Sequence, residues 1–291
     1  MGKVILQVLG TAQDAGLPQP NCYCDNCSKA IDDLTFKRRA ASVAVVLPDK
    51  KQWHLIDASP DFKEQIVMVQ RAHGLEGRVM ESIFLTHAHI GHYPGLIYLG
   101  REAMDTQNVP VFAGALMKGV LENHAPWRQL TDLGNIQVKE IRNGCPTELE
   151  ESVKVTAVEV PHRNEFSETF GFWITGPKKK ALYIPDIDSW EEWELNIVDA
   201  CKQADICLLD ATFFSERDLA HSGGSDRDLS EIPHPFITDT MERLKTISKT
   251  CEIYFTHFNH SNPALKPGSD ARKLIEMYGF HIADDGMMFD L

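Results

Sequence analysis

Three histidines stand close together in residues 86–92, at His87, His89 and His92. Side chains two residues apart in an extended segment point to the same face, and a turn at Gly91 can bring the third imidazole back to the other two. Three imidazoles next to an apolar run repel one another if they are charged and lack partners if they are neutral. A shared metal ion resolves both problems, so we interpret the run as a metal site rather than as surface histidines.

A second cluster contains Cys22, Cys24 and Cys27, whereas the other four cysteines are scattered. An odd number of cysteines in this arrangement fits a secreted disulfide framework poorly. Three thiolates can supply a structural zinc ion with three of its four ligands, the fourth coming from elsewhere in the chain. The alternative is a loop of reduced thiols, but residues 16–21 show no helix or strand pattern, and a metal would order them.

Short apolar, β-branched runs predict strands, and the longer stretches between them predict helices. The predicted strands cover about residues 3–9, 42–47, 52–57, 81–85, 153–160, 169–175, 180–184, 205–210 and 252–255. The predicted helices cover about residues 60–72, 94–104, 190–202, 235–248 and 270–278, the last with Asp270 as its candidate N-cap. This mixture predicts sheets covered by helices in one continuous domain.

Polar side chains follow directly after several of the predicted strands. These residues are Asp57, His87, His162, Asp186, Asp210 and His257. Loops that leave the ends of buried strands can hold converging ligands, because the strands anchor them in the core. The alternative is that a polar residue merely marks the point where a strand leaves the core, and for any single aspartate both interpretations stay open.

The histidine run resembles the signature of the metallo-β-lactamase superfamily, His-x-His-x-Asp-His followed by a distant His, an Asp and a final His. Asp57 in Leu55-Ile56-Asp57-Ala58 matches the first motif, and His162, Asp186 and His257 match the third, fourth and fifth motifs. The resemblance covers nearly the whole chain. It implies an α/β (α+β) fold, the four-layer αββα sandwich, as a single domain over residues 1–291 with a cysteine-rich zinc loop at 16–28.

The resemblance also implies a set of active-site metal ligands. His87, His89 and His162 would form the first site, Asp186 would bridge, His92 and His257 would belong to the second site, and Asp57 would support the ligands from outside. Gly91 stands where the family carries the acidic ligand of the second metal, so one or two divalent ions are expected. Zn²⁺ is the expected ion, with Fe²⁺ and Mn²⁺ as alternatives, since two histidines and one carboxylate also suit non-haem iron.

The cysteine stretch, residues 18–27, looks like the same region in two families of this superfamily. They are pyrroloquinoline quinone biosynthesis protein B and the cyclic phosphodiesterase of the carbon-phosphorus lyase pathway. In the phosphodiesterase the fourth zinc ligand is a histidine three positions after the fifth-motif histidine, a place that His260 occupies here. The resemblance therefore assigns a structural Zn²⁺ to Cys22, Cys24, Cys27 and His260. Further segments, such as Asp210-Ala211-Thr212-Phe213, resemble the quinone-biosynthesis family, which usually carries a degraded histidine run.

A hard divalent ion at the histidine site would lower the pKa of bound water and supply hydroxide, which predicts a metal-dependent hydrolase for a small phosphodiester, ester or lactone. The catalytic residues would be Asp186 and His234. His234 ends a segment, residues 211–235, that is long enough to be an active-site lid, and the phosphodiesterase resemblance puts a catalytic histidine there. The alternative for His234 is a surface histidine beside prolines.

Two other functions stay open from the sequence: an iron-dependent oxygenase like pyrroloquinoline quinone biosynthesis protein B, and a non-catalytic, metal-stabilised carrier or binding protein. The 42 acidic residues outnumber the 29 basic ones, for a net charge of −13, which favours a small-molecule substrate over long nucleic acids. No apolar stretch approaches the roughly 20 residues that span a bilayer, and no signal peptide is recognisable. We expect a cytoplasmic protein without a membrane partner, and the sequence predicts no oligomeric state.

Overall fold

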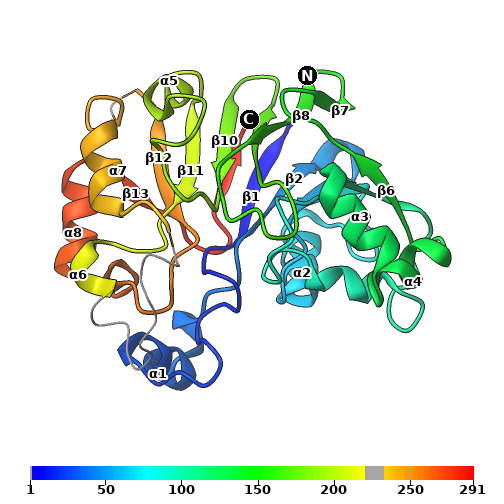
Figure 1. The fold of residues 1–291 in the computed structure, drawn as a ribbon, viewed down its shortest axis with the longest axis horizontal. Helices are drawn as coiled ribbons and strands as arrows, with labels where there is room; N and C mark the ends of the chain where they lie inside the picture. Colours follow the sequence, from blue (N-terminus) through cyan, green and yellow to red (C-terminus); the bar gives the residue numbers. More distant parts are fainter. Residues whose placement is uncertain (1, 220–232, 249) are drawn as a thin grey trace.

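Two seven-stranded sheets pack face to face, and helices cover the outer side of each (Figure 1). The computed structural model describes residues 2–219, 233–248 and 250–291. The predicted αββα sandwich is confirmed by this arrangement. In the described part of the chain no helix is long and apolar enough to cross a membrane.

The first sheet has the order β14-β1-β2-β3-β4-β5-β6. Its strands are β1 (Ile5–Gly10), β2 (Ser42–Leu47), β3 (Gln52–Ile56), β4 (Ser82–Phe84), β5 (Val109–Ala113), β6 (Ile136–Glu140) and β14 (Met288–Asp290). The second sheet has the order β13-β12-β11-β10-β9-β8-β7. Its strands are β7 (Pro146–Glu150), β8 (Val153–Glu159), β9 (Phe170–Thr175), β10 (Lys180–Ile184), β11 (Ile206–Asp210), β12 (Glu252–Thr256) and β13 (His281–Ile282).

Helices pack on each sheet through apolar side chains. The α-helices are α1 (Asp25–Asp32), α2 (Phe62–His73), α3 (Ala115–Asn123), α4 (Trp127–Asp132), α5 (Ile197–Cys201), α6 (Glu216–Leu219), α7 (Ile237–Leu244) and α8 (Asp270–Met277). Helices α2, α3 and α4 share a core with the first sheet, and α5, α7 and α8 share one with the second. Short 3₁₀ helices include η3 (Pro94–Leu99) and η5 (Pro263–Leu265).

The central strands are buried on both faces, which explains why they are continuous apolar runs rather than alternating ones. In β2, Val43 and Val45 face the core between the sheets, whereas Ala44 and Val46 face the helices. The exposed edge strand β7 carries mostly polar residues, and its burial pattern shows no apolar face. For that reason apolar runs predict the central strands and miss β7.

Strand direction brings several strand ends to one edge of the sandwich. Strands β3 and β4 run parallel, and β1 runs parallel to them because it pairs antiparallel with β2, which pairs antiparallel with β3. Strands β10, β11 and β12 also run parallel, and β8 joins their direction through β9. The carboxyl ends of the strands in each set therefore lie at the same edge of their sheet. Helix α1 lies at the end of the molecule away from both chain termini (Figure 1).

Three predictions about helices were wrong. Residues 94–104 form only the 3₁₀ helix η3, which begins at Pro94 and is followed by turns. Residues 190–196 are turns that bury Trp190 and Trp193, and the helix begins after the N-cap Asn196. The N-cap of α8 is Ser269, whose hydroxyl accepts from the Arg272 amide, while Asp270 is the first helical residue. In each case a local capping or turn contact outweighed the wider pattern.

Candidate metal centre

The residues predicted to bind or support the catalytic metal follow strands whose carboxyl ends share one edge. Asp57 follows β3, the histidine run follows β4, His162 follows β8, Asp186 follows β10 and His257 follows β12. Two of these positions use backbone that side chains rarely adopt, since φ is 65° at Asp57 and 61° at His257. Such conformations are held by the surrounding structure and are concentrated at functional sites.

One carboxylate oxygen, Asp186 Oδ2, lies at the middle of the cluster. It is 3.4 Å from His87 Nε2 and 3.2 Å from His162 Nε2. It is also 3.7 Å from the Nε2 atoms of both His92 and His257. His89 completes the first group, with its Nδ1 atom 3.1 Å from His162 Nε2. One ligand atom from each of His87, His89, His162 and Asp186 lies within 4.8 Å of the others, close enough for one ion to reach all four.

The outer nitrogen of each buried imidazole is held by another side chain. His92 Nδ1 is 2.8 Å from Asp57 Oδ2, and His162 Nδ1 is 2.7 Å from Asp188 Oδ1. Hydroxyls take the same place elsewhere, with Thr86 Oγ1 2.9 Å from His87 Nδ1 and Thr212 Oγ1 3.1 Å from His257 Nδ1. These contacts orient the rings and leave each Nε2 atom pointing inwards, as in metal sites where outer groups fix the ligands.

Several of the inward-facing atoms have no hydrogen-bond partner among the described residues. The Nε2 atoms of His87, His92 and His257 and the Oδ1 atom of Asp186 are buried without a hydrogen bond. Leaving such groups unpaired costs about 1–3 kcal/mol each, so a protein that keeps several of them together has a reason to do so. A set of imidazoles and one carboxylate is the donor set of a divalent transition metal, and the residues present fit such an ion.

The pKa shifts in the cluster differ from one residue to the next. Burial, with the neighbouring His92, lowers the pKa of His87 well below its usual value. Burial also acts to lower the pKa of His162, but the Asp186 and Asp188 carboxylates outweigh it and raise that pKa to about 10. Burial opposes ionisation of Asp186, yet the surrounding imidazoles hold the pKa of this carboxyl well below its usual range. Asp186 is therefore ionised and His87 neutral, the forms that bind metals, whereas His162 would release a proton when an ion binds.

His234 lies beside the cluster rather than on the surface, so the surface alternative for this residue is wrong. Its side chain is 1% exposed, and its Nδ1 atom is 2.7 Å from Asp210 Oδ2. Its buried Nε2 atom has no hydrogen-bond partner among the described residues, and its ring centroid is 5.6 Å from that of His162. Residues 220–232 of the predicted lid lie outside the described residues.

Asp210 also lies within 4.8 Å of Asp186 and His257, but its oxygens are already committed. Oδ2 accepts from the Ile187 amide in addition to its contact with His234, and Oδ1 accepts from the Thr212 amide. A carboxylate held by two backbone amides and an imidazole has little freedom to turn towards a metal. We therefore interpret Asp210 as the group that orients His234.

Sequence reasoning missed two acidic residues at the centre. Asp188 bonds His162, and its only sequence signal was its position two residues after Asp186. Asp14 groups with His92 and His257, with one ligand atom of each residue within 4.8 Å of the others. Asp14 follows the end of β1 just as the other site residues follow their strands, and that pattern could have identified it.

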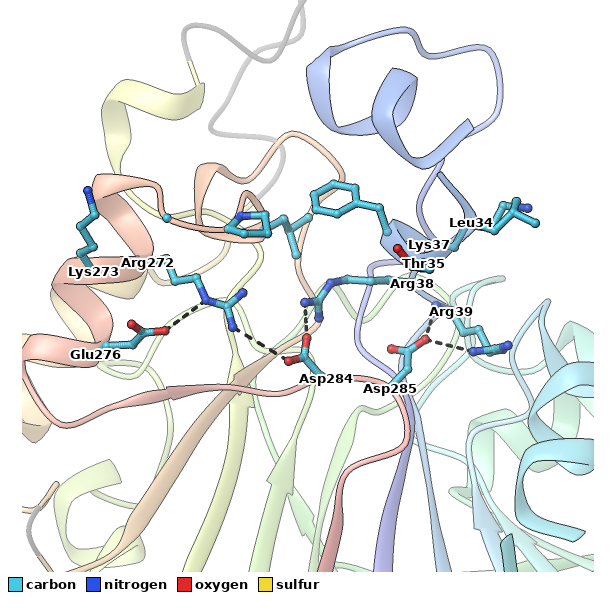
Figure 2. Close-up of a pocket in the computed structure, with 14 residues that line it drawn as sticks. Leu34, Thr35, Lys37, Arg38, Arg39, Arg272, Lys273, Glu276, Asp284 and Asp285 are labelled. Atoms are coloured by element: carbon cyan, nitrogen blue, oxygen red, sulfur yellow. Dashed lines mark hydrogen bonds and ion pairs between the residues drawn. The ribbon is translucent and has the colours of Figure 1, made fainter. Parts of the chain in front are cut away.

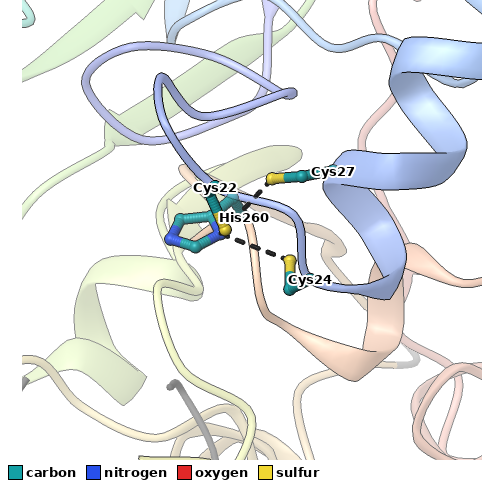
Figure 3. A group of neighbouring side chains, drawn as sticks. All are labelled: Cys22, Cys24, Cys27 and His260. Atoms are coloured by element: carbon teal, nitrogen blue, oxygen red, sulfur yellow. Dashed lines mark hydrogen bonds between the residues drawn. The ribbon is translucent and has the colours of Figure 1, made fainter. Parts of the chain in front are cut away.

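The cysteine cluster forms a second, separate group with the predicted histidine (Figure 3). His260 Nδ1 lies 3.4 Å from Cys22 Sγ, 3.6 Å from Cys24 Sγ and 3.5 Å from Cys27 Sγ. The four ligand atoms lie within 4.8 Å of one another, and burial raises the pKa of the Cys27 thiol to about 12. Three thiols around one ring nitrogen are the donor set of a structural zinc. The binding of a metal at either site stays a prediction.

A cavity of about 700 Å³ lies apart from both groups (Figure 2). Its arginines are paired with acids: Arg38 with Asp284, and Arg39 with Asp285. Arg272 in turn lies 3.1 Å from Glu276. These pairs reduce the positive charge that the three arginines offer to an anionic ligand.

Comparison with known proteins identifies the superfamily of this chain. The model of the β-lactamase superfamily domain matches residues 52–286, which include the histidine run and His257. The chain belongs to this superfamily. Its sequence is 26% identical to coenzyme PQQ synthesis protein B of Methylococcus capsulatus, over 98% of this chain and 99% of that protein.

Two solved structures of this superfamily fold cover almost the whole chain. The Zn²⁺-bound PqqB from Methylobacterium extorquens has a TM-score of 0.83 at 24% identity, covering 99% of this chain and 100% of that one. A diphosphatase from the PhnP family has a TM-score of 0.70 at 23% identity, covering 99% of this chain and 98% of that one. The predicted resemblance to both groups is confirmed, and at these identities the structures establish the shared fold.

Proposed function

We propose that this protein is a metal-dependent hydrolase for a small phosphodiester, ester or lactone. The observation that carries the proposal is the set of buried imidazole Nε2 atoms that surround Asp186 Oδ2 at 3.4–3.7 Å and make no hydrogen bond among the described residues. Structural ion pairs fill their hydrogen bonds, whereas these nitrogens face a common carboxylate oxygen without one. A divalent ion bound there supplies Lewis acidity and lowers the pKa of a coordinated water towards neutrality.

The chain's own residues supply orientation and a proton. Asp57, Asp188 and the two threonine hydroxyls hold the ligand rings, so the centre is organised before substrate arrives. His234 is the candidate proton donor to the leaving group. Burial acts to lower its pKa, but Asp210 and Asp186 outweigh burial and raise that pKa above its usual value. A histidine whose acid form is favoured by neighbouring carboxylates, and whose ring lies beside that of His162, is suited to act as a general acid.

The partners we propose are small molecules. The net charge of −13 disfavours long polyanions, and we propose neither a nucleic-acid nor a membrane partner. All seven cysteines are free thiols in the structure, and three of them surround His260. Free thiols that bind zinc persist in a reducing compartment, so we propose a cytoplasmic protein with a structural Zn²⁺ at this site.

Turnover with defined metals tests the hydrolase. Full-length protein is loaded with Zn²⁺, Mn²⁺ or Fe²⁺ and assayed with bis-p-nitrophenyl phosphate, phenyl acetate and a simple lactone. We expect hydrolysis of at least one substrate that is abolished by chelation and by His87→Ala. The matched control is His124→Ala, which removes an exposed histidine outside the centre. Absence of turnover on every substrate, with the metal content verified, would refute the proposal.

An iron-dependent oxygenase is the second candidate, favoured by the full-length similarity to coenzyme PQQ synthesis protein B. Two histidines and one carboxylate, here His92, His257 and Asp186, suit Fe²⁺. Anaerobic loading with Fe²⁺, followed by oxygen-uptake measurements with tyrosine-containing peptides, separates the candidates, because a hydrolase is indifferent to oxygen. A non-catalytic carrier would instead bind metal only at the cysteine site.

A further inference from the structure

We propose that Asp14 is a metal ligand of the second site and replaces the carboxylate that the histidine run lacks at Gly91. This inference deepens the proposed hydrolase and rests on its metal centre. The first argument is position: Asp14 is half-buried and has a carboxylate oxygen within 4.8 Å of ligand atoms of both His92 and His257. Asp186 Oδ2 lies 3.7 Å from both imidazole Nε2 atoms and would supply the second carboxylate.

The second argument is that these imidazoles need a ligand. His92 is 1% exposed and His257 is fully buried, and in the described part of the chain the Nε2 atom of each has no hydrogen-bond partner. Their Nδ1 atoms are occupied by Asp57 and Thr212, so neither ring can turn to satisfy Nε2 without losing a buried contact. Two nitrogens facing two carboxylates match the oxygen and nitrogen donors that Zn²⁺, Mn²⁺ and Fe²⁺ accept.

The third argument is that Asp14 uses the space of the missing side chain. A Cβ atom at Gly91 would lie 2.6 Å from both Cα and Oδ1 of Asp14, closer than atoms can approach. Any side chain at position 91 is therefore incompatible with Asp14 in its present place. Glycine at 91 leaves room for a carboxylate from the loop after β1. Asp14 can therefore take the place of an acidic ligand at position 91.

The loop that carries Asp14 is fixed from two directions. The Gln13 amide donates to the Phe258 carbonyl at 2.9 Å, and the Phe258 amide donates to the Thr11 carbonyl at 2.8 Å, which ties the loop to the residue after His257. On its other side, Arg38 Nη1 donates to Thr11 Oγ1 at 2.8 Å and also pairs with Asp284, as Figure 2 shows for the latter contact. A ligand on such a braced loop is held in place before the metal binds.

Counting metal ions tests the assignment without measuring turnover. Full-length protein and Asp14→Gly are equilibrated with excess Zn²⁺, desalted and analysed for zinc per chain. Glycine tolerates the backbone at this position, where φ is 40°. We expect three ions in the parent protein, one at the cysteine site and two at the centre, and two in Asp14→Gly. The matched control is Asp105→Gly, which removes an exposed aspartate with φ of 46°, and it should keep three.

A second variant tests the same site by filling the space beside Asp14. Gly91→Ala removes no ligand atom but places a methyl group against Asp14. We therefore expect it to lower the affinity of the site formed by Asp14, His92 and His257 for its ion at least tenfold. Mn²⁺ serves as a second probe, because two bridged ions give an exchange-coupled electron paramagnetic resonance spectrum that Asp14→Gly should lose. Equal zinc content in the parent protein and Asp14→Gly, or only one ion at the parent centre, would overturn the assignment.

These results are separable from the proposed function. Two ions at the centre with no hydrolysis of any substrate would refute the hydrolase and leave Asp14 as a ligand. Hydrolysis with a single ion at the centre, unchanged in Asp14→Gly, would refute the assignment of Asp14 and leave the hydrolase.

Discussion

Replacing His234 with alanine should impair the reaction to a degree that depends on the leaving group. His234 Nδ1 is fixed by Asp210 at 2.7 Å, and its buried Nε2 atom has no hydrogen-bond partner among the described residues. A positioned general acid contributes about 10²–10⁴-fold in rate, or roughly 3–5 kcal/mol of the barrier. We expect a loss of this size in kcat for substrates with an alkoxide leaving group. For p-nitrophenolate, which leaves without a proton, we expect a loss below about threefold.

The pH profile of the same substrates gives an independent readout. Because Asp210 and Asp186 raise the pKa of His234 above its usual value, the acid form is present below that raised pKa and is lost as the pH rises through it. The alkoxide substrates should therefore lose kcat at high pH, and His234→Ala should remove this limb of the profile.

The assay is a series of aryl and alkyl esters or phosphodiesters measured with one metal at saturating substrate. His124→Ala serves as the control for the loss of a histidine, since His124 is exposed. Equal losses across all leaving groups would show that His234 supports the structure or binds substrate, and the reasoning from its free Nε2 atom would be refuted.

Three further predictions concern the metals and stability. Cys27→Ser should remove one zinc ion per chain and lower the melting temperature, as measured by elemental analysis and calorimetry, because a thiolate ligand is lost; unchanged zinc content would contradict it. Asp57→Asn should lower metal affinity at the centre about 10–100-fold in a chelator competition, because His92 loses the carboxylate that orients it; wild-type affinity would exclude this role. Burial lowers the pKa of His54 to about 4, from 6.5, so its stabilisation is complete above pH 6.5 and is lost as the pH falls towards 4. Between pH 7 and 5 this costs about 2 kcal/mol in the free energy of unfolding, so the loss of stability in urea titrations should be smaller in His54→Asn than in the parent protein by about this amount.

Much of the fold was predictable because the central strands bury both faces. Such strands are continuous apolar runs, and the sequence marks each of the nine that we predicted. Strands β6 and β7 and the short β13 and β14 were missed, since they lie at the sheet edges and carry polar residues or too few residues to form a run. Strand β5 was missed although it is apolar, because Pro110 interrupts its pattern. Helix ends were set by local contacts, such as the Ser269 cap, which patterns alone do not rank.

The sequence by itself determined the donor types: a histidine run, a cysteine cluster, and acids and histidines placed at strand ends. These donor types can be recognised because they depend only on residue type and local spacing in the sequence. Only the tertiary structure decided which donors meet, because that depends on strand order and direction. Asp14 approaches Gly91 from 77 positions away because β1 runs parallel to β3 and β4. In the same way, Asp210 meets His234 and Asp188 meets His162 only after the second sheet has formed.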